Sequence, residues 1–325
     1  MYYRNLGRTG LKVSAICLGT GEYGNQVVEK EATRIMDGAL ASGINFFDTA
    51  DAYAEGRSEE IIGRALKGKR HSVVLATKVA RRMGPGPNDI GLSRKHIMEG
   101  IESSLRRLQT DYIDLYYVHS PDPTTPIQET LRTLDDLVHQ GKVLYIGCDN
   151  FRAWQLCKAL WVSDRGNLAR FDCIELPYNL ITRDIEYELL PLCASEGVGV
   201  CVYNPLAGGL LTGKHDPNKP PAEGTRFSLK HVGQMYRERY WSATNFEAVA
   251  RLKQIASEYG RNLTQFALAW ILNNEKITSA VCGASSLEQL EENIGAIEIG
   301  LSKEELAACD GVWQWLRPPR FFDGR

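Results

Sequence analysis

The sequence predicts an α/β fold: a closed (β/α)8, or TIM, barrel with a β-hairpin before its first strand and an extra helix after its last unit. Three observations lead to this prediction. Short apolar runs recur eight times, segments of helical period lie between them, and the runs begin about every 30 residues through the first seven units. Eight βα units make a closed barrel, and a chain of 325 residues lies within the range that one barrel fills. We therefore expect residues 1–325 to form a single domain.

The eight predicted strands are apolar through most of their length and do not alternate between apolar and polar residues. This pattern is typical of parallel strands that are buried on both faces. The runs comprise residues 13–19, 44–50, 73–79, 113–119, 144–150, 174–179, 198–204 and 277–284. The preceding segment, residues 2–12, contains the turn sequence Arg-Thr-Gly and predicts the hairpin.

Helical segments alternate with these strands. Residues 29–42 place Ala32 and Ile35 on one apolar face. Similar periods cover residues 94–108, 127–139, 183–196 and 245–259. The regular spacing breaks at residues 205–243, which are rich in Gly, Pro and charge and predict a long insertion. A serine-capped segment, residues 302–316, predicts the extra C-terminal helix.

Composition excludes several classes of protein. Lys and Arg total 38 against 40 for Asp and Glu, so no global positive field attracts nucleic acid or an anionic membrane. No apolar segment approaches the 18 residues or more of a membrane span, and no secretory signal precedes the first strand. The eight cysteines form no Cys-x-x-Cys pair. We expect a cytoplasmic protein with buried, reduced thiols and no metal site.

Four side chains with acid-base chemistry fall at the carboxyl ends of consecutive predicted strands, where barrel enzymes carry their active sites. Asp48 ends the second strand, Tyr53 follows in its loop, Lys78 ends the third strand and His119 ends the fourth. Taken singly, each residue is explained more readily by a structural role. Their placement together at one end of the barrel predicts a catalytic group.

The residue types suggest how this group divides its work. A tyrosine in water titrates near ~10, too high for ready proton exchange at neutral pH. A nearby Lys78 ammonium would lower the pKa of Tyr53, and Asp48 would keep that lysine charged and oriented. His119, on the opposite side, can form a hydrogen bond with the same substrate oxygen that exchanges a proton with Tyr53. Such a group protonates a carbonyl oxygen or deprotonates an alcohol.

An alternative interpretation rests on Gly19, Gly21 and Gly24, which form a GxGxxG pattern after the first strand, with Asp48 at the end of the next. A Rossmann dinucleotide-binding unit has this arrangement. Glu22 would place a carboxylate in the phosphate loop, and the following helix begins too late to present its N-terminus to a phosphate. A Rossmann-type dehydrogenase is therefore the less favoured alternative.

Longer stretches of the chain resemble aldo-keto reductases, in family order and over nearly its whole length. The matching stretches are GRTGLKVSAICLGTGEYG (7–24), INFFDTADAY (44–53), LATKV (75–79), LYYVHSPDP (115–123), GKVLYIGCDNF (141–151), VYNPLAGGLLTGK (202–214) and GASSLEQLEENIGA (283–296). The last two look most like the branch that contains bacterial inositol-operon reductases and potassium-channel β subunits.

The resemblance implies a barrel oxidoreductase that moves a hydride between NADP(H) and the carbonyl or alcohol carbon of a small to medium substrate. Tyr53 would be the general acid-base catalyst, assisted by Asp48, Lys78 and His119. The residues that it implies around the nicotinamide are Gly19, Thr20, Asp48, Asp149, Asn150, Glu175 and Tyr203. Those implied along the pyrophosphate are Asn204, Pro205, Leu206, Gly209, Thr212 and Lys214. Those implied at the adenosine end are Arg226, Gly283, Ser285, Gln289, Glu292 and Asn293.

Two departures from the family pattern concern the nicotinamide end. Asp149 replaces the usual serine and Glu175 the usual glutamine. Negative charge there would favour the cationic, oxidised nicotinamide and bias the protein toward alcohol oxidation. Alternatively, one carboxylate is protonated or paired with a neighbour such as Arg152.

Other departures concern cofactor choice and pocket size. Gly283 and Gln289 stand where other branches carry Lys and Arg, so NAD(H) is an alternative to NADP(H). Gly21 occupies a position where relatives often have tryptophan, which predicts a wider pocket. Tyr23 and the aromatic residues of 225–243 either line this pocket or pack in the core.

A second function is compatible with the same residues. The resemblance to channel β subunits suggests a regulatory subunit that binds NADP(H) and turns over little substrate. The expected partner is a small carbonyl or alcohol substrate in either case. The sequence predicts neither the substrate nor the oligomeric state.

Overall fold

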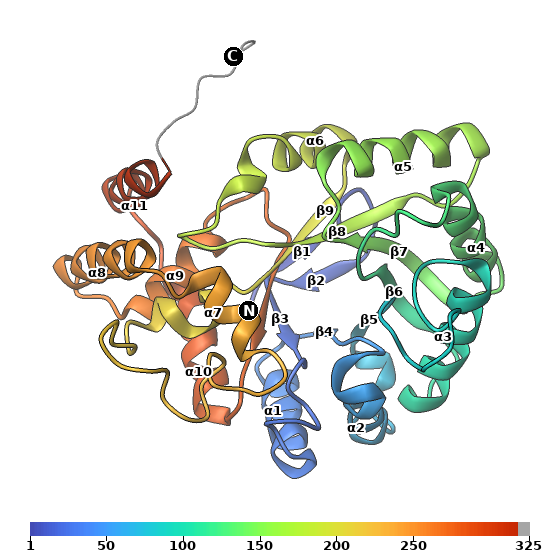
Figure 1. Cartoon of the computed structure of the whole chain (residues 1–325), viewed down its shortest axis with the longest axis horizontal. Coiled ribbons are helices and arrows are strands. Elements are labelled where there is room, and N and C mark those ends of the chain that lie inside the picture. The colour runs from blue at the N-terminus through green and yellow to red at the C-terminus, as the bar shows by residue number, and fades with distance from the viewer. Residues whose placement is uncertain (318–325) are drawn as a thin grey trace. The chain divides into compact units, whose positions relative to one another are not determined.

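The computed structural model describes residues 1–317 and contains a closed barrel of eight parallel strands (Figure 1). Residues 318–325 of the predicted domain lie outside the described residues. The barrel strands are β3 (Ile16–Gly19), β4 (Phe46–Asp48), β5 (Val74–Val79), β6 (Ile113–Val118), β7 (Val143–Asp149), β8 (Phe171–Pro177), β9 (Gly199–Tyr203) and β10 (Ser279–Gly283). They follow one another around the barrel in chain order, and β10 pairs with β3 to close it. The predicted (β/α)8 barrel is confirmed, and the Rossmann alternative, which needs an open sheet, is wrong.

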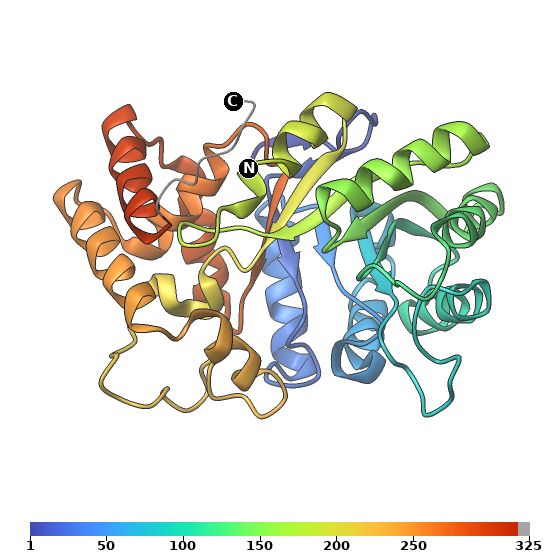
Figure 2. The same ribbon diagram turned by 45° about the horizontal axis from the view of Figure 1, so that its top comes forward.

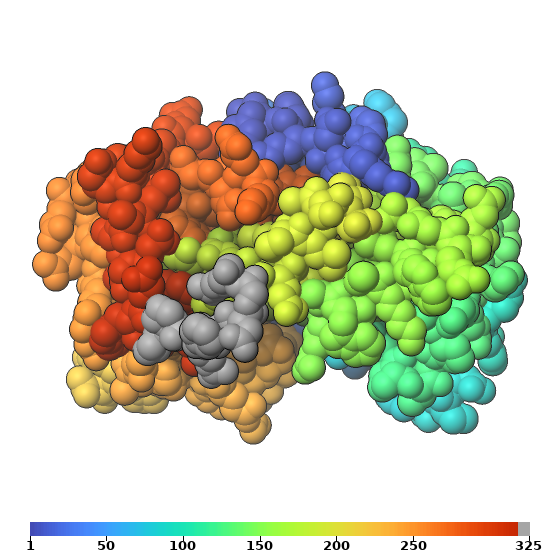
Figure 3. Space-filling view, turned by 90° about the horizontal axis from the view of Figure 1, so that it is seen from above, coloured from blue at the N-terminus to red at the C-terminus, as the bar shows by residue number. Residues whose placement is uncertain are grey.

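A short antiparallel hairpin precedes the barrel, as predicted. It consists of β1 (Tyr3–Asn5) and β2 (Lys12–Ser14). The first barrel strand begins at Ile16 and not at residue 13, because Val13 pairs with Arg4 inside the hairpin. The hairpin turn lies against the segment that leads into β9, where the amide of Arg8 donates to the carbonyl of Gly197 at 2.8 Å (Figure 3).

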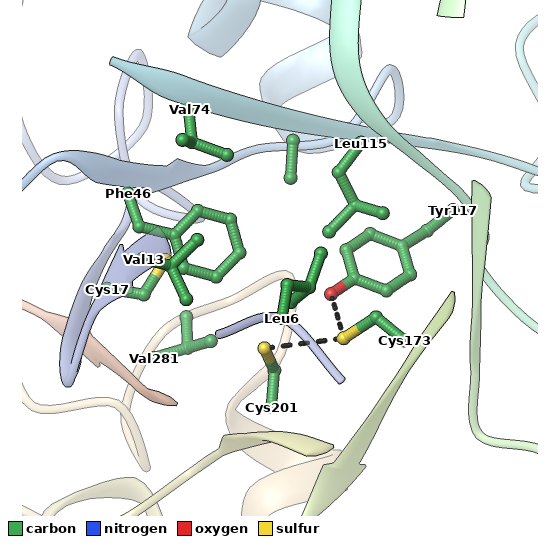
Figure 4. Close-up of a cluster of buried hydrophobic side chains, with 11 residues drawn as sticks. Leu6, Val13, Cys17, Phe46, Val74, Leu115, Tyr117, Cys173, Cys201 and Val281 are labelled. Atoms are coloured by element: carbon green, nitrogen blue, oxygen red, sulfur yellow. Dashed lines mark hydrogen bonds between the residues drawn. The ribbon is translucent and has the colours of Figure 1, made fainter. Parts of the chain in front are cut away.

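An apolar cluster fills the barrel beside the hairpin (Figure 4). Leu6 and Val13 come from the hairpin segment, and the strands contribute inward-facing side chains such as Phe46 and Leu115. Every one of these four side chains is almost completely buried. Burial of such a cluster is the main driving force for closing the barrel, at about 25 cal/mol per Å² of apolar surface removed from water.

Helices lie outside the strands of the barrel unit (Figures 1 and 2). Those of the first part of the chain are α1 (Glu29–Ala41), α2 (Arg57–Ala65), α3 (Arg94–Leu108), α4 (Ile127–His139), α5 (Ala153–Gly166) and α6 (Leu189–Glu196). The remaining helices are α7 (Gly233–Tyr240), α8 (Ala243–Glu258), α9 (Leu263–Leu272), α10 (Leu287–Gly295) and α11 (Lys303–Leu316). The predicted C-terminal helix is therefore present as α11, and its Ser302 cap accepts a hydrogen bond from the amide of Glu305. Among residues 1–317, no helix combines the length and the apolar composition needed to cross a membrane.

One predicted helix differs from its expected extent. Residues 183–196 were expected to be a single helix, but they contain a 3₁₀ turn (Asp184–Glu186) followed by α6 from Leu189. Pro191 explains the late start. Proline lacks an amide hydrogen and is tolerated in the first turn of a helix but not in its interior.

The chain divides into two compact units. The barrel unit comprises residues 1–176, 185–203 and 276–291, and the second unit comprises residues 177–184, 204–275 and the chain from Glu292. The second unit contains α7, α8, α9 and α11, with α11 packed on α8. The single domain predicted for the whole chain stays a prediction.

The eight cysteines are free thiols. Seven are buried, as expected, and Cys157 on α5 is exposed. Inside the barrel, Cys173 lies between the hydroxyl of Tyr117 at 3.1 Å and the sulfur of Cys201 at 3.5 Å (Figure 4).

Candidate active site

The four predicted acid-base residues all belong to the barrel unit and stand at the carboxyl ends of its strands. Asp48 is the last residue of β4, Lys78 the penultimate residue of β5, and His119 directly follows β6. Tyr53 opens a 3₁₀ turn (Tyr53–Gly56) between β4 and α2. The structure thus brings together the four residues that the sequence singled out.

A buried ion pair forms the base of this site. Lys78 is fully buried, and its Nζ donates hydrogen bonds to Asp48 Oδ1 and, at 3.2 Å, to the carbonyl of Thr49. Glu175 Oε2 lies 3.4 Å from the same nitrogen. Burial alone would lower the pKa of Lys78, but Asp48 and Glu175 raise that pKa well above its usual value. Lys78 is therefore a permanent buried cation at neutral pH.

The loop that carries Tyr53 is tied to the lysine strand. The amide of Asp51 donates to the carbonyl of Lys78 at 3.2 Å, and the amide of Tyr53 donates to that of Ala50 at 3.1 Å. Directly after the tyrosine, Ala54 and Glu55 adopt left-handed conformations, with φ of 50° and 58°. Such conformations are costly for residues other than glycine and gather at functional sites.

Tyr53 is half-buried, and its ring stacks over the lysine with 5.5 Å between the ring centroid and Nζ. Burial raises the pKa of the Tyr53 hydroxyl, Lys78 lowers it, and the carboxyl groups nearby raise it. The pKa lies above its usual value in sum. The expected effect of Lys78 is present, but the expectation of a lowered pKa is wrong because burial outweighs the single positive charge.

His119 lies beside the tyrosine and is uncharged at neutral pH. Its ring meets the ring of Tyr53 edge to face, with 5.9 Å between the centroids. Burial lowers its pKa well below the usual value, and the positive charges of Lys78 and Arg81 lower it further. A neutral imidazole has one N–H donor and one acceptor nitrogen, so His119 can donate a hydrogen bond without carrying charge.

Asp149 and Glu175 face one another across neighbouring strands β7 and β8. Each is only 3% exposed. Burial and mutual repulsion raise the pKa of Asp149 well above its usual value, and burial together with Asp48 raises the pKa of Glu175 to about 8. Lys78, and not Arg152, is the cation beside Glu175, and Arg152 is exposed. The pairing with Arg152 is therefore wrong, whereas a protonated carboxyl group agrees with these pKa shifts.

Two more residues of the predicted nicotinamide set are connected in the barrel unit. The Tyr203 hydroxyl donates to Asn150 Oδ1 at 2.7 Å, and Asn150 Nδ2 donates to the carbonyl of His119 at 3.2 Å. Asn150 has a φ of 62°, a left-handed conformation that asparagine adopts more readily than most residues. These contacts join the ends of β6, β7 and β9.

The remaining predicted cofactor residues are divided between the two units. Gly19 pairs with Gly283 where β3 meets β10, and Ser285 Oγ donates to Gln289 Oε1 at 3.0 Å, all within the barrel unit. Thr20 lies in the barrel unit too, where its hydroxyl donates to the carbonyl of Asp48 at 2.8 Å. The members in the second unit are Asn204, Pro205, Leu206, Gly209, Thr212, Lys214, Arg226, Glu292 and Asn293.

Within the second unit, the predicted pyrophosphate segment contains a run of left-handed residues. Ala207, Gly208 and Gly209 have φ values of 50°, 70° and 98°. Two amides of this run donate within the loop itself, that of Ala207 to the carbonyl of Asn204 at 2.9 Å and that of Gly209 to the carbonyl of Leu206 at 2.8 Å. Asn204 ahead of this run accepts a hydrogen bond from the Tyr236 hydroxyl at 2.9 Å.

The aromatic residues considered for the pocket favour the packing interpretation. Tyr23, Phe227, Tyr236 and Tyr240 are all buried. The expectation for Gly21 has support, because a side chain there would begin 3.8 Å from the ring of Tyr53. Because residue 21 is glycine, no side chain from this position covers that side of the Tyr53 ring.

Sequence reasoning missed a second buried polar cluster behind the site. Glu59 of α2 is fully buried and accepts hydrogen bonds from Thr77 Oγ1 and Arg107 Nε, both at 2.6 Å. Asp51 is 1% exposed, and burial and the nearby Glu59 raise its pKa to about 8. A charged residue in a helix usually lies on the solvent-exposed face, so no local sequence pattern predicted that Glu59 is buried.

Comparisons with known proteins agree with this architecture. A profile of the aldo/keto reductase family matches residues 15–314. A protein of Arabidopsis thaliana named as a probable voltage-gated potassium channel subunit beta is 40% identical over 305 residues, covering 92% of each chain. A protein of Oryza sativa subsp. japonica with the same description is 41% identical over 305 residues, again covering 92% of each chain. The chain is therefore a member of the aldo/keto reductase family. Within that family its similar relatives include proteins named as channel β subunits, as the sequence resemblance indicated.

Proposed function

We propose that this protein is an oxidoreductase that transfers a hydride between a nicotinamide dinucleotide and the carbonyl or alcohol carbon of a small to medium substrate. Membership of the aldo/keto reductase family supports the reaction class. The observation that carries the proposal is the buried Lys78–Asp48 pair beneath the ring of Tyr53, with neutral His119 beside it. NADP(H) is the proposed cofactor, with NAD(H) as the alternative.

The residues present fit such a cofactor. His119 Nδ1 and Asp149 Oδ1 are buried atoms for which residues 1–317 provide no hydrogen-bond partner. A ligand amide is a suitable partner for such atoms, because buried polar atoms normally form hydrogen bonds. The nicotinamide, when bound, would donate or accept the hydride.

The chain itself would handle the proton. Tyr53 would donate its hydroxyl proton to the carbonyl oxygen as that oxygen gains negative charge, and would take it back in alcohol oxidation. Lys78 would stabilise the phenolate that remains, because the two groups are close and Lys78 keeps its charge. His119, being neutral, would donate a hydrogen bond to the substrate oxygen without competing as an acid.

Binding tests the cofactor assignment first. Intrinsic tryptophan fluorescence, titrated with NADPH, NADP⁺, NADH and NAD⁺ at one pH and salt concentration, should reveal binding in the micromolar range or tighter. The ratios between the four ligands report recognition of the 2′-phosphate and of the oxidised ring. Absence of binding below about a millimolar, a free energy near −4 kcal/mol, would contradict the proposal.

Tyr53→Phe tests the catalytic assignment. The variant removes the proton donor and keeps the ring, so turnover of simple aldehydes and ketones should fall by about 10²–10⁴-fold while cofactor binding is retained. Steady-state absorbance of the reduced cofactor measures the first quantity and fluorescence titration the second. Unchanged turnover in Tyr53→Phe would assign the proton transfer to another group.

The names of the relatives favour a second candidate function. The Arabidopsis and rice proteins are described as probable β subunits of voltage-gated potassium channels. Under this alternative, the protein binds a nicotinamide dinucleotide as a regulatory subunit, turns over little and has a protein partner. Cofactor binding without turnover on any carbonyl in a broad panel would favour it. We propose a cytoplasmic location and a single functional domain for both candidates.

A further inference from the structure

Three carboxyl groups surround one buried cation in this site. Asp48, Asp149 and Glu175 are 2%, 3% and 3% exposed, and Lys78 is fully buried. Three full negative charges against one positive charge would be very unfavourable in a site shielded from water. At least one of the carboxyl groups must hold a proton.

The geometry shows where that proton belongs. The carboxyl groups of Asp48 and Glu175 lie within hydrogen-bonding reach of each other. Their oxygens Asp48 Oδ2 and Glu175 Oε2 are buried, and neither accepts a well-formed hydrogen bond from a donor of residues 1–317. An ionised carboxylate can only accept, so two of them form no hydrogen bond, whereas one shared proton satisfies both groups.

We propose that Glu175 is a positioning residue that holds a proton toward Asp48, so that Lys78 is balanced by one carboxylate while this proton is present and by two once it is lost. The effect on Tyr53 rests on the function proposed above, but the protonation of Glu175 does not. The proton belongs to Glu175 because Asp48 accepts a direct hydrogen bond from Lys78, which stabilises its ionised form. Glu175 is farther from the ammonium, at 3.4 Å.

The groups around Glu175 come from most strands of the barrel. Asp48 on β4, Lys78 on β5 and Asp149 on β7 interact with it most directly. The other titratable groups that sense its charge are Tyr53, Tyr117 on β6, Cys17 on β3 and Cys201 on β9. Each of these four has a raised pKa and stays neutral near pH 8, so they do not titrate in the same range.

The consequence is a dependence of the site on pH. Burial and Asp48 place the pKa of Glu175 at about 8. Below that value, Lys78 faces the single negative charge of Asp48. Above it, the new charge on Glu175 raises the pKa of Tyr53, which then releases its proton less readily. Glu175 thereby adjusts the acid strength of Tyr53 without touching the reacting atoms.

Glu175→Gln tests the protonation in the cofactor-free full chain. Glutamine copies the shape and the donor of a protonated glutamate but cannot ionise. In the wild type, the folded state holds a proton that the unfolded state has released, so stability falls as pH rises from about 5 to about 8. The unfolding constant of the wild type relative to Glu175→Gln should therefore rise by up to about tenfold per pH unit across this window and level off above it.

Urea denaturation of both proteins at several pH values measures this ratio. Glu223→Gln, a change at an exposed glutamate, is the matched control and should leave the ratio flat. If the ratio for Glu175→Gln does not change from pH 5 to 9, whichever protein is the more stable, Glu175 is an ordinary ionised carboxylate and the proposal is overturned.

A second measurement does not depend on how well the variant folds. Asp51 is a second buried carboxyl group with a pKa of about 8, so the measurement is made in an Asp51→Asn background. Infrared spectroscopy of this protein during a pH titration should show the carbonyl band of a protonated carboxylic acid disappearing near pH 8, and this component should be missing once Glu175→Gln is added. The same component with and without Glu175→Gln would contradict the assignment.

Kinetics then test the positioning role. The pH profile of kcat/KM for the wild type, normalised to its own value at pH 7, should contain an ionisation near 8 that the equally normalised profile of Glu175→Gln lacks. An identical profile in the two proteins would remove the link to Tyr53. If neither protein turns over any substrate, the proposed oxidoreductase function fails, but the stability and infrared results still decide whether Glu175 holds the proton.

Discussion

Neighbouring residues of β5 belong to two buried polar clusters of opposite character. Lys78 points into the barrel and pairs with Asp48, whereas Thr77 points outward and donates to Glu59, which Arg107 also binds. Successive side chains of a strand face opposite sides, so one strand serves both clusters. The comparison separates buried charge at the proposed active site from buried charge that holds a helix against a strand.

The difference lies in how completely the carboxylate that pairs with the cation is satisfied in each cluster. Asp51, beside the outer cluster, does not belong to its satisfied network, because neither of its carboxyl oxygens has a well-formed hydrogen-bond partner within residues 1–317. Both oxygens of Glu59 accept hydrogen bonds from side chains, at 2.6 Å each. In the inner cluster, Asp48, Asp149 and His119 each keep a buried polar atom without a hydrogen-bond partner within residues 1–317. Satisfied networks hold helices and strands in place, whereas unsatisfied buried atoms are a place where a ligand can bind.

Breaking the inner cluster should have the largest effect, and on activity. Lys78→Met removes the cation beneath Tyr53 and leaves Asp48 without its main partner. We expect kcat/KM for carbonyl reduction to fall by about 10²–10⁴-fold, because the phenolate loses its stabilising charge. Steady-state kinetics measure the loss, with circular dichroism to verify the fold. Activity within a few-fold of the wild type would mean that the inner cluster is merely structural.

Breaking the outer cluster should affect stability instead. Arg107→Met leaves the buried carboxylate of Glu59 without its cation, which costs about 3 kcal/mol of unfolding free energy. Urea denaturation at pH 7 measures this loss, and kcat of the folded variant should stay within a few-fold of the wild type. Arg107→Lys is the matched control, since it keeps the charge but not the geometry. A large loss of kcat under conditions in which the variant is fully folded would show that the outer cluster also contributes to catalysis.

Asp51 lies between the two clusters, and its replacement should have the smallest effect of the three, a change in how stability depends on pH. It interacts with Glu59 and Arg107 on one side and with Lys78 on the other, and burial raises its pKa to about 8. The folded state therefore holds its proton between pH 4 and 8 while the unfolded state does not, so its contribution to stability falls as pH rises.

Asp51→Asn removes this titration. Relative to the wild type, the variant should gain about 2 kcal/mol of unfolding free energy between pH 6 and pH 7.5, as judged by denaturation midpoints across that range. The same variant in the Glu175→Gln background should give an additive gain if the two groups titrate independently. A stability difference that stays constant across this pH range would show that Asp51 is ionised in the folded protein.

The sequence by itself determined the barrel and the ends of its strands. The apolar runs predicted all eight strands because burial on both faces leaves a local, readable pattern. The same pattern placed Asp48, Lys78 and His119 at strand ends, and the position of a side chain on a strand depends on a few neighbouring residues. The start of α6 was less predictable, because Pro191 shifted it from residue 183 to Leu189.

Tertiary structure alone decided the charge states. Periodicity does not reveal that Glu59 is buried by Arg107, which lies 48 positions later, or that Glu175 meets Asp48 across the barrel. The pKa of each group depends on burial and on charges that come from distant strands, so the expected lowering of the Tyr53 pKa was reversed. The sequence supplies the residue types that the proposed chemistry needs. The closed barrel determines which of them are protonated, because it buries them and brings charges from distant strands close together.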